Sequence, residues 1–175
     1  MTYFKLFLAL VISVNFSCAQ APTDRPLLQD KKFDARVSRL IDFSIPIISV
    51  DELNQNYSDY IIFDTREKEE FAVSHLKGAQ YLGYEDFDVS KLSDLPKNSK
   101  IVLYCSVGYR SEKIGEKLKK LGYQNVFNLY GSIFEWINRG HPVVDFYGNE
   151  TQKVHTYNKS WSKWVNDDTE FDKIW

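Results

Sequence analysis

The chain has 175 residues, of which 43% are hydrophobic and 26% are charged, and its formal net charge at pH 7 is −2. This length is sufficient for one globular domain with a buried core and flanking segments. The slightly negative charge, with no basic stripe along the sequence, argues against a nucleic-acid partner.

The first 19 residues have the pattern of a secretory signal. Lys5 is their only charged residue, residues 6–14 are apolar, and Ser17, Cys18 and Ala19 supply small side chains before a cut at Gln20. The apolar run is too short for a stable membrane-spanning helix. An alternative is a lipoprotein signal, with lipid attached at Cys18, which the preceding residues match poorly. We therefore expect an exported protein, periplasmic or associated with the outer membrane if bacterial, and leave a membrane tether through Cys18 open.

The sequence contains two cysteines. If Cys18 is removed or lipidated, Cys105 remains as a single thiol that has no partner for an internal disulfide. An unpaired cysteine in an exported protein is a candidate reactive group.

Residues 20–44 carry two prolines and scattered charges. This composition predicts a linker, with a short helix within residues 33–41.

From residue 45 onward, short apolar runs alternate with helical patterns. Strands are predicted at residues 47–50, at 60–63 and around Tyr81. Ser49 and Glu52 have the spacing of a capping box, which predicts a short helix after the first strand. Asp64 ends the second strand, and a polar helix start leads to Phe71.

The most informative stretch begins with a buried strand at residues 101–104, which ends on Cys105. A turn containing Gly108 leads into a helix over 112–121, in which Ile114, Leu118 and Leu121 recur at helical spacing. The sequence therefore places a cysteine where a strand ends and a helix begins.

This position favours the thiolate of Cys105. The first amides of a helix have no partner within the helix, and they carry the positive end of its dipole. A tight loop there directs several N–H groups inward as an anion cradle. Such surroundings commonly lower a cysteine pKa from about 8.5 to about 7 or below. Arg110 adds a positive charge at the rim, and the Ser111 hydroxyl is a candidate donor to the sulfur.

A further strand is predicted at 126–129 and a helix from Ser132 to about Gly140, with Ile133, Trp136 and Ile137 on one face. The alternation of strands and helices predicts a small, doubly wound α/β domain with a mostly parallel central sheet flanked by helices.

The last thirty residues, 146–175, contain three of the four tryptophans, and their aromatic residues fall near helical spacing. We expect this C-terminal extension to pack on the domain. The alternative is a face that binds a protein partner, because exposed aromatic side chains often anchor interfaces. No cysteine pair accompanies His141 or His155, so we predict no structural metal. We also expect no cofactor.

Three motifs resemble, in the correct order, the signatures of rhodanese-like sulfurtransferases. The loop from Cys105 to Ser111 is similar to their active-site loop C-x-x-G-x-R-S. Residues 63–67 with Phe71 and residues 75–79 resemble the N-terminal signature, although Ser74 replaces its usual glycine. Residues 130–136 resemble the C-terminal one, with Ser132 in place of a second glycine. The resemblance covers residues 45–145, the predicted domain.

The resemblance implies a catalytic residue and a substrate loop. Cys105 would carry sulfur as a persulfide, and the amides and side chains of the loop would bind the substrate: Ser106, Val107, Gly108, Tyr109, Arg110 and Ser111. Asp64, Arg66 and His75 would support the loop from behind, His75 in a structural role. Lys113 and Tyr109 would shape access to the thiol.

The implied reaction moves sulfane sulfur from a small anionic donor such as thiosulfate, or from a persulfide, to a thiol or cyanide. Two alternatives remain. One is a non-catalytic module that binds a partner or senses redox state, although degenerate members usually lose the cysteine. The other is a cysteine-dependent phosphatase, whose loop has five residues between cysteine and arginine, whereas four separate Cys105 from Arg110.

Overall fold

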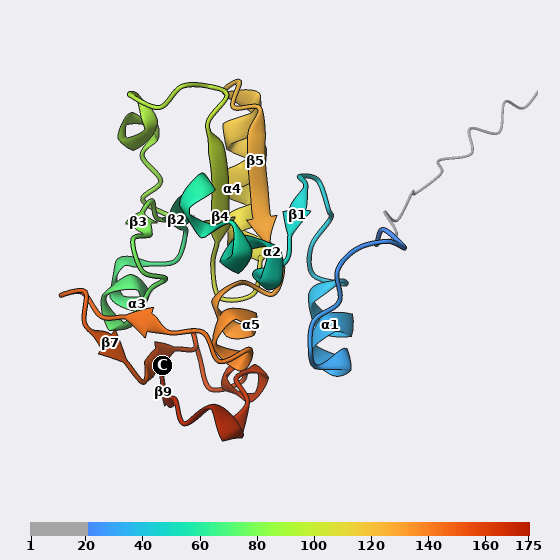
Figure 1. Cartoon of the computed structure of the whole chain (residues 1–175), viewed down its shortest axis with the longest axis vertical. Coiled ribbons are helices and arrows are strands. Elements are labelled where there is room, and N and C mark those ends of the chain that lie inside the picture. Colours follow the sequence, from blue (N-terminus) through green and yellow to red (C-terminus); the bar gives the residue numbers. More distant parts are fainter. Residues whose placement is uncertain (1–20) are drawn as a thin grey trace, which may run out of the picture.

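A five-stranded parallel sheet forms the centre of the protein in a computed structural model that describes residues 21–175 (Figure 1). The predicted export signal and Cys18 lie outside the described residues. Among residues 21–175, no helix has both the length and the apolar character that crossing a membrane requires.

The sheet has the strand order β1-β5-β4-β2-β3. Its strands are β1 (Ile47–Ile48), β2 (Ile61–Asp64), β3 (Gln80–Tyr81), β4 (Lys100–Tyr104) and β5 (Asn125–Leu129). The helices are α1 (Lys31–Val37), α2 (Val50–Gln55), α3 (Lys68–Val73), α4 (Tyr109–Lys120) and α5 (Ser132–Asn138). This arrangement confirms the predicted fold class.

Two predicted boundaries shift for local reasons. The first strand ends at Ile48 because the Ser49 side chain caps α2, accepting a hydrogen bond of 3.1 Å from the Glu52 N–H. Helix α4 begins three residues earlier than predicted, because Gly108 has φ of +118° and turns the chain directly into the helix.

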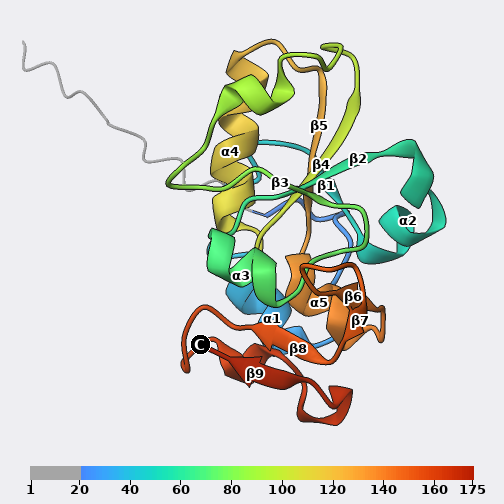
Figure 2. The same ribbon diagram turned by 90° about the vertical axis from the view of Figure 1, so that its left-hand side faces the viewer.

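Two hydrophobic clusters lie on opposite faces of the sheet. Successive side chains of a strand point to opposite faces, and β4 divides accordingly: Ile101 and Leu103 pack with α4, whereas Val102 and Tyr104 pack in the cluster that includes α2 and α5. Figure 2 shows α4 and α2 on opposite sides of the strands. Because apolar side chains pack on both faces of the sheet, the carboxyl end of β4, which Cys105 follows, has a fixed position in the domain.

The segment before the sheet is part of the domain, so the predicted linker is corrected for residues 25–41. Phe33 is fully buried and stacks on Trp164, with ring centroids 5.4 Å apart. Arg25 forms an ion pair of 2.6 Å with Asp34. The apolar stripe along this segment packs in the larger cluster: Leu28, Phe33, Val37 and Ile41.

The C-terminal extension packs on the domain, although the near-helical spacing of its aromatic residues does not correspond to an α-helix within residues 146–175. Strands β6 (Val143–Val144) and β7 (Glu150–Thr151) pair antiparallel, and β8 (Lys153–His155) and β9 (Asp172–Ile174) pair parallel. Val154 and Val165 are buried, and the Asn138 side chain donates a 2.8 Å hydrogen bond to the Trp164 carbonyl. Figures 1 and 2 show the extension at the end of the domain toward which β5 points.

Candidate active site

Cys105 begins the loop between β4 and α4, and the amino end of α5 holds this loop in place. The N–H groups of Ile133 and Phe134 donate to the carbonyls of Cys105 and Ser106 at 3.2 and 3.3 Å. The Ser132 hydroxyl accepts the Cys105 N–H at 3.1 Å. Ser132 therefore fixes the main chain at Cys105. From the sequence it was noted only as a residue that replaces the second glycine of a Gly-Gly pair.

The loop stabilises a thiolate on Cys105, which is 2% exposed. Burial alone would raise the pKa of this thiol. The positive charge of Arg110 and the main-chain N–H groups of Ser111, Gly108 and Val107 outweigh burial and lower the pKa from its ordinary value. The Gly108 N–H donates to Sγ at 3.1 Å. The predicted anion cradle thus forms around the sulfur.

The Ser111 hydroxyl has a different role from the one predicted. It donates to Asn128 Oδ1 at 2.7 Å rather than to the sulfur, and Asn128 Nδ2 donates to the Gly108 carbonyl at 2.9 Å. Ser111 reaches the thiolate through its main-chain N–H alone. Asn128, on β5, was not among the predicted site residues, and its two hydrogen bonds hold the turn at Gly108.

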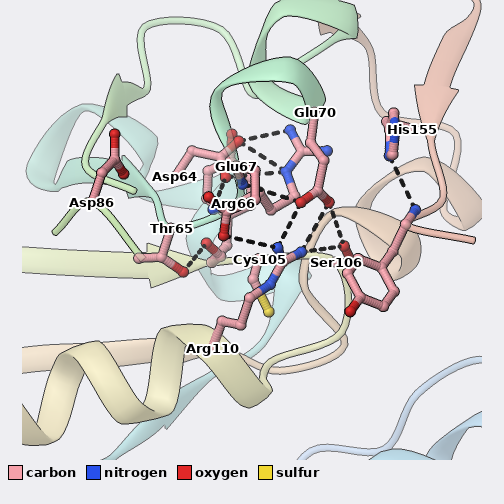
Figure 3. Close-up of polar contacts among 12 residues, drawn as sticks. Asp64, Thr65, Arg66, Glu67, Glu70, Asp86, Cys105, Ser106, Arg110 and His155 are labelled. Atoms are coloured by element: carbon pink, nitrogen blue, oxygen red, sulfur yellow. Dashed lines mark hydrogen bonds and ion pairs between the residues drawn. The ribbon is translucent and has the colours of Figure 1, made fainter. Parts of the chain in front are cut away.

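Arg110 is paired with a carboxylate that the sequence analysis missed. Its two terminal nitrogens contact the Glu70 oxygens at 2.5 and 2.8 Å, and Nη2 also donates to the Ser106 hydroxyl at 3.0 Å (Figure 3). Burial would raise the pKa of Glu70, but Arg110 holds it below its usual value. Glu70 and Glu67 form a capping box at the start of α3, with glutamate at the N-cap where the sequence signature has Ser, Thr, Asp or Asn. Most of the Arg110 charge is therefore balanced by Glu70.

Asp64, Arg66 and His75, which were predicted to support the loop, do not line the cavity. Asp64 and Arg66 form a salt bridge of 2.7 Å between fully buried side chains, and Arg66 also donates to the Ser74 carbonyl. His75 stacks on Phe71 with ring centroids 3.9 Å apart, and its main chain pairs with Val144. Burial lowers the pKa of His75. These contacts fix the ends of α3, which carries Glu70.

A cavity of about 260 Å³ opens onto the thiol. Five of the predicted residues line it: Cys105, Ser106, Val107, Tyr109 and Arg110. The other lining residues are Leu40, Glu67, Tyr84, Glu85, Tyr157 and Trp161. Tyr109 thus lies at the entrance as predicted. Gly108 and Ser111 are not among the lining residues. They contribute main-chain N–H groups that stabilise the Cys105 thiolate.

Lys113 does not reach the cavity wall. Its ammonium group bonds Asp42 at 2.8 Å and Glu116 at 2.9 Å. These two carboxylates and Glu112 form the one group in the described part of the chain with the spacing of metal ligands. Lys113 already supplies the positive charge there, and Glu112 accepts the N–H groups of Asp42 and Ser44.

The Arg110 charge predicts a pH dependence. In the unmodified protein, alkylation of Cys105 by iodoacetamide should rise with pH through a midpoint below the ordinary thiol pKa, because the thiolate reacts. Arg110→Gln should raise this midpoint by about one pH unit, since a favourable charge is lost. Glu70→Gln, which keeps Arg110 but removes its compensating charge, should not raise it. An unchanged midpoint in a folded Arg110→Gln variant would contradict this account.

Comparisons with known proteins agree with this geometry. The family model described as the rhodanese-like domain matches residues 49–139, about half of the chain. The chain is 33% identical over 86 residues to a sulfurtransferase of Allochromatium vinosum, covering 49% of this chain and 79% of that protein. It is 33% identical over 95 residues to a tRNA uridine(34) hydroxylase of Bdellovibrio bacteriovorus, covering 52% of this chain but only 27% of that protein.

Solved structures show the same fold. The rhodanese-like domain of the Anabaena protein Alr3790 superimposes with a TM-score of 0.54 at 22% identity, covering 58% of this chain and 80% of that one. The match to the family model includes Asp64, Cys105 and Arg110, whereas Leu40, Tyr157 and Trp161 lie outside it. The chain therefore belongs to the family of rhodanese-like domains.

Proposed function

We propose that this protein is a sulfurtransferase that carries sulfane sulfur as a persulfide on Cys105. The observation that carries the proposal is a single thiol, held in a loop of N–H groups, at the wall of a cavity that is large enough for a small sulfur compound. The similarity to a sulfurtransferase of Allochromatium vinosum supports it. Export, predicted from residues 1–19, remains part of this proposal.

The reaction consists of two displacements at sulfur. The Cys105 thiolate attacks the outer sulfur of a donor. With thiosulfate, the S–S bond of the donor breaks, sulfite leaves with the bonding electron pair, and Cys105 holds a persulfide. An acceptor thiolate or cyanide then attacks the outer sulfur of the persulfide, and the Cys105 thiolate leaves. No net oxidation or external electron source is needed.

The surrounding groups have separate roles in this cycle. The N–H groups of Val107, Gly108 and Ser111 stabilise the negative charge on Cys105 before attack and after release. Ser106 and Arg110 hold Glu70 and thereby keep the loop next to α3. The loop is therefore ready for the reaction without rearrangement of its main chain.

The test is the intact mass of the purified protein before and after treatment with a donor, followed by cyanide. Thiosulfate in large excess and the persulfide of 2-mercaptoethanol serve as two separate donors. We expect the mass of one sulfur atom to be gained at Cys105 and then removed by cyanide as thiocyanate. If neither donor adds sulfur while Cys105 is reduced and reacts with iodoacetamide, the proposal fails, and a non-catalytic binding module becomes the better description.

A further inference from the structure

The cavity over Cys105 has apolar and aromatic lining residues from three parts of the chain. Tyr84 and Tyr109 belong to the domain that the family model matches, whereas Tyr157 and Trp161 belong to the C-terminal extension. Leu40, from the segment after α1, completes this apolar surface. The segments on either side of the matched domain therefore shape the space in which the thiol reacts.

Tyr157 is held at the cavity by an unusual backbone. Its φ of +66° is uncommon for an aromatic residue and costs free energy, so such positions often serve a function. The Tyr157 N–H donates to His155 Nδ1 at 3.1 Å, and the Arg110 guanidinium lies 5.4 Å from the centre of the Tyr157 ring. Tyr157 remains 55% exposed, so its side chain can contact a ligand as well as Arg110.

The charged groups on the cavity wall do not favour an anion. Glu67 and Glu85 line the cavity, and Glu85 is exposed. Arg110 is the one cationic side chain on that wall in the described residues, and its charge faces Glu70 directly and Glu67 at 3.8 Å (Figure 3). When Cys105 is a thiolate, the side chains that line the cavity carry net negative charge. Two further cations face the outer aromatic rings: Arg36 lies 5.3 Å from the ring centre of Trp161 and Lys117 lies 5.9 Å from that of Tyr84. A dianion such as thiosulfate would approach against the negative charge of the lining residues, without a free arginine or lysine on the wall to bind it.

We propose that the sulfur compound which exchanges sulfur with Cys105 is an organic persulfide or thiol with an apolar body that carries no negative charge, held among the rings of Tyr84, Tyr109, Tyr157 and Trp161. This inference rests on the proposed function and narrows its substrate class. The aromatic rings bury the apolar body. The carboxylates of Glu67 and Glu85 tolerate a neutral group and attract a cationic one.

The corresponding step balances without a further reactant. The Cys105 thiolate attacks the outer sulfur of R–S–SH, the S–S bond breaks, and the thiolate RS⁻ leaves while Cys105 becomes a persulfide. In the reverse direction RS⁻ accepts the sulfur. The same wall thus serves the compound both as donor and as acceptor.

The first test compares donors of similar length whose organic groups differ in charge. The persulfides of cysteamine, 2-mercaptoethanol and 3-mercaptopropionate carry a cationic, a neutral and an anionic group beyond the two sulfur atoms. The rate at which each adds sulfur to Cys105 is measured by quenched intact mass at low ionic strength and divided by its rate with a small free thiol. We expect the anionic donor to be about tenfold slower than the cationic one, and thiosulfate to be slower still.

Glu85→Gln isolates the contribution of the entrance charge, because this exposed side chain forms no hydrogen bond or ion pair with the residues from 21 to 175. This substitution should raise the normalised rate of sulfur addition from the anionic donor about two- to threefold, and it should lower the rate from the cationic donor by a similar factor. Asp94→Asn removes an exposed carboxylate that does not line the cavity, so the normalised rates of both donors should stay unchanged. Equal effects of the two substitutions would contradict the role of Glu85.

A second variant pair tests the aromatic wall. The persulfide of benzyl thiol should react faster than that of 2-mercaptoethanol after the same normalisation, and Tyr157→Ala should remove this advantage. Tyr147→Ala removes a tyrosine that is 84% exposed and away from the cavity, so the advantage should remain.

The two proposals fail in different ways. If thiosulfate or the anionic persulfide is the fastest normalised donor, and Tyr157→Ala leaves the order of donors unchanged, the substrate class proposed here is overturned although the sulfurtransferase function stands. If no donor adds sulfur to Cys105, the proposed function itself is overturned.

Discussion

Cys105→Ser should abolish sulfur transfer, lowering the rate of thiocyanate formation by about a thousandfold or more, because a serine hydroxyl cannot hold the sulfane sulfur. The change is small in volume, and the serine oxygen can accept the Gly108 N–H that now bonds the sulfur. The thermal midpoint should therefore move by only a few degrees. This separates loss of chemistry from loss of fold.

Measurement of thiocyanate from cyanide and a persulfide donor checks this result, with the melting of both proteins followed by circular dichroism. Activity of the serine variant above the uncatalysed rate would show that sulfur passes through another group. A variant that is inactive because it is unfolded would instead reveal itself in the melting curve.

Asp64→Asn should cost about 3–5 kcal/mol in the free energy of unfolding. Both Asp64 and Arg66 have fully buried side chains, and the carboxylate accepts three hydrogen bonds from the Arg66 side chain. Asparagine keeps the size but leaves the Arg66 charge buried without an opposite charge. Because Arg66 also holds the Ser74 carbonyl after α3, the position of Glu70 should loosen as well.

Urea denaturation measures this cost, and Asp59→Asn is the matched control. Asp59 pairs with Lys100 at 3.3 Å, but both side chains are 53% exposed. Surface pairs of this kind contribute roughly 0–1 kcal/mol. If Asp64→Asn were no more destabilising than Asp59→Asn, the buried pair would not stabilise the fold as its geometry indicates.

The local parts of the site could be predicted because neighbouring residues determine them. An apolar strand, a glycine turn and a helix follow one another directly around Cys105, so the loop and its N–H groups were visible in the sequence. The pairing of Arg110 with Glu70 was not visible, because it joins residues forty positions apart whose approach depends on how the fold places α3 and α4 relative to each other. The direction of the Ser111 hydroxyl depends in the same way on β5, which supplies Asn128.

The flanking segments were the least predictable. Prolines and charges before residue 45 suggested a linker with a short helix. A helix forms there as α1, and Phe33, Val37 and Ile41, which recur every four residues, are buried in the larger hydrophobic cluster. The aromatic residues of the extension fall at helical intervals by coincidence, and β8 and β9 form instead. Neither pattern indicates that Leu40, Tyr157 and Trp161 meet over Cys105, since that depends on how both segments pack on α5 and α3.

The isolation of Cys105 also determines how the protein withstands oxidants. It is the one cysteine among residues 21–175. If hydrogen peroxide converted it to a sulfenic acid, the described chain would offer no second thiol to trap that acid as a disulfide. Repair would then depend on a thiol that enters the cavity from solution, and without one oxidation would proceed to the irreversible sulfinic acid. The compound that accepts sulfur from Cys105 would then also be the one that protects it.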